Sequence, residues 1–175
     1  MGFVKNVIYL FTDKETNMIE LNVKGIALDP KSGMPIILLS ERDGHRLLPI
    51  WIGPFEASSI ILQMEGVRPP RALTHDILAL IFKRHGLEVR RLEIYNATQN
   101  NYLSRVIYRK RFRTFSIEVR PSDGIALALR TGGSIFAEES VLSDNQENDL
   151  YLQNLDPASA EVLFLRQQDF NSHVM

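Results

Sequence analysis

The sequence predicts an α+β domain in which two internally duplicated β-β-β-α units pack around one core. The length of 175 residues suits a single domain, and a hydrophobic content of 45% is enough for a sizeable core. Three strand-like segments followed by an apolar helix occur twice along the chain. The two copies also correspond at a constant spacing of 67 positions. The matched pairs are Ile50 with Ile117, Ile52 with Val119, Pro54 with Pro121, and Glu56 with Asp123.

The first unit begins at Met18, after a polar segment that is typical of a linker. Its predicted strands cover 19–28, 34–40 and 45–52. Pro54 then starts a helix over 55–65, because proline suits the first helical turn, and Gly66 ends it. Thr74 is predicted to cap a second helix over 75–85. A proline-stiffened connector joins the two helices.

The second unit repeats this order. Its predicted strands cover 87–97, 101–108 and 111–119, and its helix covers 122–130. A short apolar segment follows at 134–137, and 159–168 has the pattern of one more helix. We therefore expect three regions: an N-terminal extension over 1–17, a domain over 18–143, and an acidic tail over 144–175.

Charge is distributed unevenly along a chain whose net charge is −1. From Lys83 to Arg113, nine basic residues face two acidic ones, and from Glu138 onward eight acidic residues face one basic one. The basic segment is of the kind that attracts phosphates, but both segments are also compatible with solvated faces. Four aromatic residues interleave with the basic segment and fit either base stacking or sheet packing. They are Tyr95, Tyr102, Tyr108 and Phe112.

Several classes of protein are excluded or disfavoured by composition. Without cysteine the chain has no disulfide, thiolate zinc site or cysteine nucleophile. It also has no apolar run of about 18 residues, so we expect no membrane span and a cytoplasmic location. Because phosphate-binding loops and metalloprotease motifs are missing, function depends on polar residues that folding brings together.

Glu56 and Asp123 are the first candidates. Each follows a helix-starting proline by two residues, where a carboxylate can bond a free backbone N–H and complement the helix dipole. The alternative is that the two carboxylates share one cleft, where they hold a divalent cation or activate water.

A second group of candidate functional residues surrounds the predicted start of the helix at 75–85. Thr74 fits helix capping and Asp76 suits the N-terminal helix dipole, whereas a functional reading makes His75 an acid or base and Asp76 the group that orients it or binds metal. Arg71 lies just before this helix, so a phosphate could bind there. Arg120, beside Asp123, forms either a plain salt bridge or a phosphate clamp.

Three segments resemble the hallmark segments of the bifunctional nuclease family. They are LPIWIGPFEASSI at 48–60, RALTHDIL at 71–78 and VRPSDGIALALR at 119–130. The resemblance runs from about Met18 to Leu142, with Gly124 standing where alanine is usual. It implies an internally duplicated α/β domain, usually an oligomer, with nuclease activity on DNA and RNA.

We therefore expect a nuclease that hydrolyses phosphodiester bonds of DNA or RNA with the help of Mg²⁺ or Mn²⁺. The expected partners are nucleic acid and further copies of the chain, in a homodimer or higher homo-oligomer. The alternative is a non-catalytic nucleic-acid-binding or regulatory module. The predicted catalytic residues are His75, Asp76, Asp123 and Glu56, the predicted phosphate-binding residues are Arg71, Arg120, Thr74 and Ser122, and the predicted metal ligands are Asp76 and Asp123.

Overall fold

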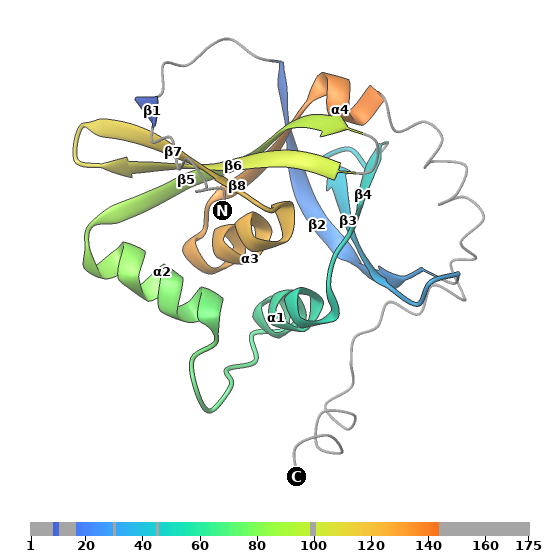
Figure 1. The fold of residues 1–175 in the computed structure, drawn as a ribbon, viewed down its shortest axis with the longest axis horizontal. Coiled ribbons are helices and arrows are strands. Elements are labelled where there is room, and N and C mark those ends of the chain that lie inside the picture. The colour runs from blue at the N-terminus through green and yellow to red at the C-terminus, as the bar shows by residue number, and fades with distance from the viewer. Residues whose placement is uncertain (1–8, 11–16, 30, 45, 99–100, 144–175) are drawn as a thin grey trace, which may run out of the picture.

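A computed structural model describes residues 9–10, 17–29, 31–44, 46–98 and 101–143. Most of the predicted N-terminal extension and all of the predicted acidic tail lie outside these residues. The described chain forms one mixed sheet, and one face of it is covered by helices α1 (Pro54–Met64), α2 (Thr74–Arg84) and α3 (Pro121–Thr131) (Figure 1). The architecture is thus mixed α and β, as the sequence predicts.

The element bounds agree closely with the predicted ones. The strands are β1 (Tyr9–Leu10), β2 (Met18–Leu28), β3 (Pro35–Glu41), β4 (Leu47–Trp51), β5 (Leu87–Thr98), β6 (Asn101–Lys110), β7 (Arg113–Val119) and β8 (Ser134–Glu138). The helices are α1 (Pro54–Met64), α2 (Thr74–Arg84), α3 (Pro121–Thr131) and α4 (Glu139–Ser143).

The strand order is β1-β7-β6-β5-β8-β2-β3-β4, and β5 with β8 is the parallel pair. On one side of β8 the order outward is β5-β6-β7, and on the other it is β2-β3-β4. The two halves therefore share both element order and strand order. Duplication of one ancestral unit stays a prediction.

The sheet curves so strongly that strands far apart in its order meet. Tyr102 of β6 donates a hydrogen bond from its hydroxyl to the carbonyl oxygen of Pro49 in β4, at 3.2 Å. As a result, the carboxyl ends of β4 and β7, which lead directly into α1 and α3, line one common pocket. This curvature positions the candidate site.

One hydrophobic core joins the two halves, as predicted. Ile50 and Ile52 are buried in it, but their counterparts Ile117 and Val119 are only half-buried against it. The packing of this core explains why residue 124 is a glycine, because a Cβ at this position would lie 2.4 Å from Leu92 Cδ1. An alanine here requires the buried Leu92 side chain to shift.

Four local features differ from the sequence-based expectations. Helix α2 begins at Thr74 itself, with Leu73 as the residue before its first turn, so the prediction that Thr74 caps it is wrong. β8 is a paired strand between the two halves, β1 pairs with β7, and α4 forms where only an acidic segment was expected. Within the described ranges, no helix is long and apolar enough to cross a bilayer.

Candidate functional site

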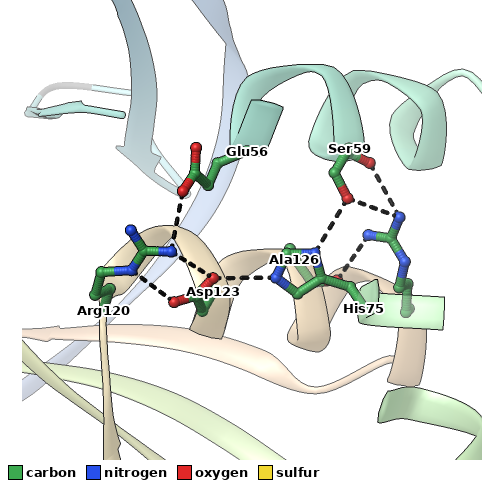
Figure 2. A network of polar contacts seen from close by, with 7 residues as sticks. Glu56, Ser59, His75, Arg120, Asp123 and Ala126 are labelled. Atoms are coloured by element: carbon green, nitrogen blue, oxygen red, sulfur yellow. Dashed lines mark hydrogen bonds and ion pairs between the residues drawn. The ribbon is translucent and has the colours of Figure 1, made fainter. Parts of the chain in front are cut away.

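The first turns of three helices converge beneath the sheet. Helix α1 starts at Pro54 and α3 at Pro121, each directly after a strand, and α2 starts at Thr74 after the connector. A chain of polar contacts links these starts (Figure 2). We call the residues of this chain the polar cluster: Glu56, Ser59, His75, Asp76, Arg120, Asp123 and Arg130.

Arg120 lies between two carboxylates at the exposed end of the cluster. Its Nε donates to Asp123 Oδ2 at 2.8 Å, and its Nη2 lies 3.0 Å from Glu56 Oε1. The Arg120 side chain is 67% exposed, so the guanidinium reaches solvent while both partners orient it. Asp123 first, and then Glu56, raise the pKa of Arg120 above its ordinary value, which keeps it charged.

His75 lies between Asp123 and Ser59. Its Nε2 is 3.1 Å from Asp123 Oδ1, and its Nδ1 is 3.2 Å from Ser59 Oγ (Figure 2). Arg130 Nη2 donates to Ser59 Oγ at 3.0 Å, so the serine hydroxyl links Arg130 to the histidine. Because an ionised carboxylate can only accept, His75 Nε2 carries a hydrogen and donates it to Asp123.

Arg130 forms the buried end of the cluster, with only 5% of its side chain exposed. Its Nε donates to Asp76 Oδ1 at 2.5 Å, and its other nitrogens donate to the carbonyl oxygens of Ser59 and Ala126 at 3.1 Å each. Asp76 Oδ2 accepts from the backbone N–H of Leu73 at 2.8 Å. Asp76 thus combines a capping contact at the start of α2 with an ion pair that ties α2 to α3.

Both aspartates of the cluster have a lowered pKa. Burial on its own raises the pKa of Asp76, but the bonds from Arg130 and Leu73 outweigh this effect and hold it below the ordinary value. Burial likewise raises the pKa of Asp123, and the bonds from Arg120 and His75 outweigh it. Both carboxylates are therefore ionised at neutral pH.

These shifts predict a loss of stability in acid. A carboxyl whose pKa is lower in the folded state than in the unfolded state stabilises the fold above its unfolded pKa, about 3.9 for aspartate. We expect the free energy of unfolding to fall as the pH drops from about 5 through that value towards the lower folded pKa. Urea titrations along this pH series measure the slope of the free energy of unfolding against pH in the wild-type protein. The variant Asp76→Asn is expected to have a flatter slope. Equal slopes for the two proteins would contradict the prediction.

The structure brings four predicted residues into direct contact and separates others from them. Glu56, Arg120, Asp123 and His75 meet at the start of α3. Within the part of the chain that the structure describes, the hydrogen bonds of the Asp76 side chain reach them through Arg130 and Ser59. Ser122 is buried in the first turn of α3, whereas Arg71 and Thr74 are exposed and make no side-chain bond to the cluster within the described residues. The predicted roles of all of them stay predictions.

Sequence reasoning missed Ser59 and Arg130. Ser59 follows Glu56 by three residues and Arg130 follows Asp123 by seven, so each shares a helix face with a predicted residue. That spacing is a signal that could have found them.

The cluster as it stands does not fit a resident divalent cation. Mg²⁺ and Mn²⁺ take oxygen ligands, but both oxygens of Asp123 and of Asp76 are engaged by N–H donors. Glu56 Oε2 packs against Gly53 so closely that a Cβ there would lie 2.2 Å from it. Among the described residues, no three acidic or histidine side chains gather as a metal site. The requirement for Mg²⁺ or Mn²⁺ stays a prediction.

The predicted basic segment is partly neutralised in the fold. Glu88 pairs with Arg90 and Arg109, and the fully buried Glu93 pairs with Arg91 and Arg105. Five basic residues of this segment form no ion pair within the described residues. They lie where α2 ends and β6 turns into β7, because Lys110 pairs with Leu87, just after α2, and with Arg113 of β7. We call them the basic surface: Lys83, Arg84, Lys110, Arg111 and Arg113.

A known protein family matches the part of the chain that contains the polar cluster. Residues 37–149, more than half of the chain, match the family model of the bifunctional nuclease domain. The chain belongs to the bifunctional nuclease domain family. The matched segment of this nuclease-domain chain contains every residue of the polar cluster.

Two relatives show how this bifunctional nuclease domain occurs elsewhere. An uncharacterized protein of Mycobacterium tuberculosis is 38% identical over 124 residues, which are 71% of this chain and 74% of that protein. Bifunctional nuclease 1 of the rice Oryza sativa subsp. indica is 26% identical over 128 residues, again 71% of this chain but 39% of the rice protein. The rice enzyme is therefore much longer than the shared domain.

Proposed function

We propose that this protein is a nuclease whose polar cluster hydrolyses phosphodiester bonds of DNA or RNA. The observation that carries the proposal is the Arg120 guanidinium, which two carboxylates hold in place at a solvent-exposed meeting point of helix starts. An oriented guanidinium suits a phosphate, because its fork of N–H groups matches phosphate oxygens. Membership of the nuclease-domain family and the nuclease name of the rice relative support the same activity.

Hydrolysis requires that water attack phosphorus while one P–O bond to a sugar breaks and the departing sugar oxygen takes up a proton from solvent. Arg120 would bind the phosphate and stabilise the charge that develops on it. Glu56 lines the same pocket as Arg120 and is placed to accept a proton from the attacking water. Since both nitrogens of His75 are engaged within the cluster, its part in this arrangement is to hold Asp123 against Arg120.

The basic surface supports nucleic acid as the substrate. Strand β7 runs from Arg113 of that surface to Val119, next to Arg120, over seven residues. Seven residues of strand span about 20 Å, at roughly 3.3 Å per residue. A nucleic-acid strand of about six nucleotides covers that distance, at roughly 3.4 Å per step. One strand can thus contact both regions.

The alternative function, a non-catalytic nucleic-acid-binding module, is favoured by one observation. The cluster is internally satisfied, and the Asp76 bond to the Leu73 N–H shows a carboxylate capping a helix. A binding module needs the basic surface but no reactive cluster.

Hydrolysis assays on the purified protein decide between the two. We expect labelled single-stranded DNA and RNA to be cleaved with activity that follows the protein through gel filtration. Each substrate is tested with EDTA, with Mg²⁺ and with Mn²⁺, which separately checks the predicted cation requirement. Salt-sensitive binding without cleavage under all three conditions would contradict the nuclease proposal and favour the binding module. Action on both DNA and RNA and a cytoplasmic location stay predictions.

A homo-oligomer is also part of the proposal. Helix α2 contains no buried residue, and its apolar side chains Ile77, Leu78, Leu80 and Ile81 are exposed. Such a patch is typical of an interface. We expect light scattering to report at least twice the chain mass of 20.0 kDa, and Leu80→Glu to shift the protein to monomer. A wild-type protein that is monomeric at about 100 μM, well above the Kd of a stable dimer, would contradict this expectation.

A further inference from the structure

A pocket of about 500 Å³ adjoins Arg120. Its walls come from the ends of β4 and β7, from the beginning of β6 and from Tyr95 of β5. Three aromatic side chains line it: Trp51, Tyr95 and Tyr102. Glu56 and Arg120 stand at the same pocket, so the candidate reaction centre and the aromatic walls belong to one continuous cavity.

The aromatic side chains are held in fixed orientations by their polar atoms. The Tyr95 hydroxyl donates to Glu118 Oε1 at 3.0 Å, and the Tyr102 hydroxyl donates to the Pro49 carbonyl at 3.2 Å. Trp51 Nε1 donates to Asp29 Oδ2 at 3.4 Å, although 40% of Trp51 is exposed. The guanidinium of Arg105 lies 5.0 Å from the centre of the Tyr95 ring. Rings that are ordered in advance lose little conformational entropy when they stack on a ligand.

We propose that this pocket binds an unpaired nucleobase of a single-stranded nucleic acid, beside the phosphate that Arg120 holds. The inference rests on the proposed function, because it supplies the base-binding half of the same site. Aromatic rings next to a cation match a nucleotide, whose flat base stacks on the rings while its phosphate pairs with the guanidinium.

The pocket selects single strands over duplexes on physical grounds. A base inside a duplex is stacked on both faces and paired along its edge, and removing it costs a few kcal/mol. An unpaired base incurs no such cost. We therefore expect single strands to bind more tightly than duplexes of the same length and phosphate spacing.

Binding of matched strands tests the inference. The probes are a ten-nucleotide single strand, its duplex, and an abasic strand that keeps the phosphates but has no bases. Affinity is measured by fluorescence anisotropy of labelled strands. Trp51, the sole tryptophan of the chain, reports stacking through quenching of its own emission. We expect the base-bearing strand to quench Trp51 and to bind about tenfold more tightly than the abasic strand, as one or two stacked bases would produce.

Substitution of Trp51 tests whether base-dependent binding takes place in this pocket. Trp51→Leu is expected to weaken binding of the base-bearing strand about tenfold and to leave the abasic strand unchanged. The control is Phe55→Leu, because Phe55 is exposed at the start of α1 and does not line the pocket. Equal binding of base-bearing and abasic strands, or unchanged Trp51 emission, would overturn the inference.

The same measurements separate the inference from the proposed function. Base-dependent binding and quenching without any hydrolysis would support the pocket and contradict the nuclease proposal. Hydrolysis with equal affinity for the two strands would support the nuclease and overturn the pocket. A duplex that binds as tightly as the single strand and quenches Trp51 equally would also overturn it.

Discussion

Replacing Arg130 by methionine is expected to lower the free energy of unfolding by about 3 kcal/mol, the cost of removing one partner from a buried ion pair. The guanidinium is almost fully buried and donates to Asp76, to Ser59 and to the Ala126 carbonyl. Methionine keeps most of the apolar stem of the side chain but cannot donate a hydrogen bond to any of these acceptors. Urea unfolding of wild type and variant gives the difference directly.

Two controls show whether the burial of Arg130 is responsible. Arg84→Met removes an exposed arginine at the end of α2 and is expected to change stability by less than about 0.5 kcal/mol. The double variant Arg130→Met with Asp76→Asn is expected to cost less than the sum of the single variants, because the two residues share one ion pair. Equal effects of Arg130→Met and Arg84→Met would show that the buried contacts contribute nothing.

Replacing Arg120 by methionine is expected to reduce kcat/KM for a single-stranded substrate about 100-fold or more, because under the proposed function it removes the group that stabilises charge on the phosphate. Stability is expected to change by less than about 1 kcal/mol, since most of the side chain is exposed and exposed ion pairs contribute little. Arg120→Lys keeps the charge but loses the fork that holds two oxygens, so an intermediate activity is expected.

The matched control for Arg120 is Arg42→Met, an exposed arginine in the turn between β3 and β4. We expect this variant to keep wild-type activity. Steady-state kinetics on all four proteins, with thermal unfolding to confirm folding, provide the comparison. An Arg120→Met protein within twofold of wild type would show that Arg120 does not contact the reacting phosphate.

Local signals made most of the fold predictable. Proline starts α1 and α3, and Gly66 and Gly132 follow their ends, so these helices could be bounded within about two residues. β8 was expected only as a short apolar segment, because its role depends on partners far away in sequence, β5 and β2. The 67-residue correspondence also treats Ile117 and Val119 as equivalents of Ile50 and Ile52, but in the structure they are only half-buried against the core.

The candidate site was partly predictable for the same reason. Four of the candidate residues could be identified from the sequence because they stand at predicted helix starts: Glu56, His75, Arg120 and Asp123. Ser59 and Arg130 lie inside apolar helical segments, and their importance appears only when α1, α2 and α3 pack together. The aromatic pocket was also hidden, because Trp51 and Tyr102 belong to strands from opposite halves of the sheet.

The central claim is that Asp123, held by Arg120 and His75, lies in the reaction centre of a nuclease. Its most direct test is kcat/KM of Asp123→Asn beside Glu65→Gln, which neutralises an exposed carboxylate just after α1. Asparagine matches the size of aspartate but cannot hold Arg120 as an ion pair. We predict a loss of about 100-fold for a folded Asp123→Asn protein, because Arg120 loses the carboxylate that orients it towards the phosphate and a small misplacement of such a group can cost that much. Glu65→Gln should remain at wild-type activity. Equal activity of the two folded variants would contradict the claim.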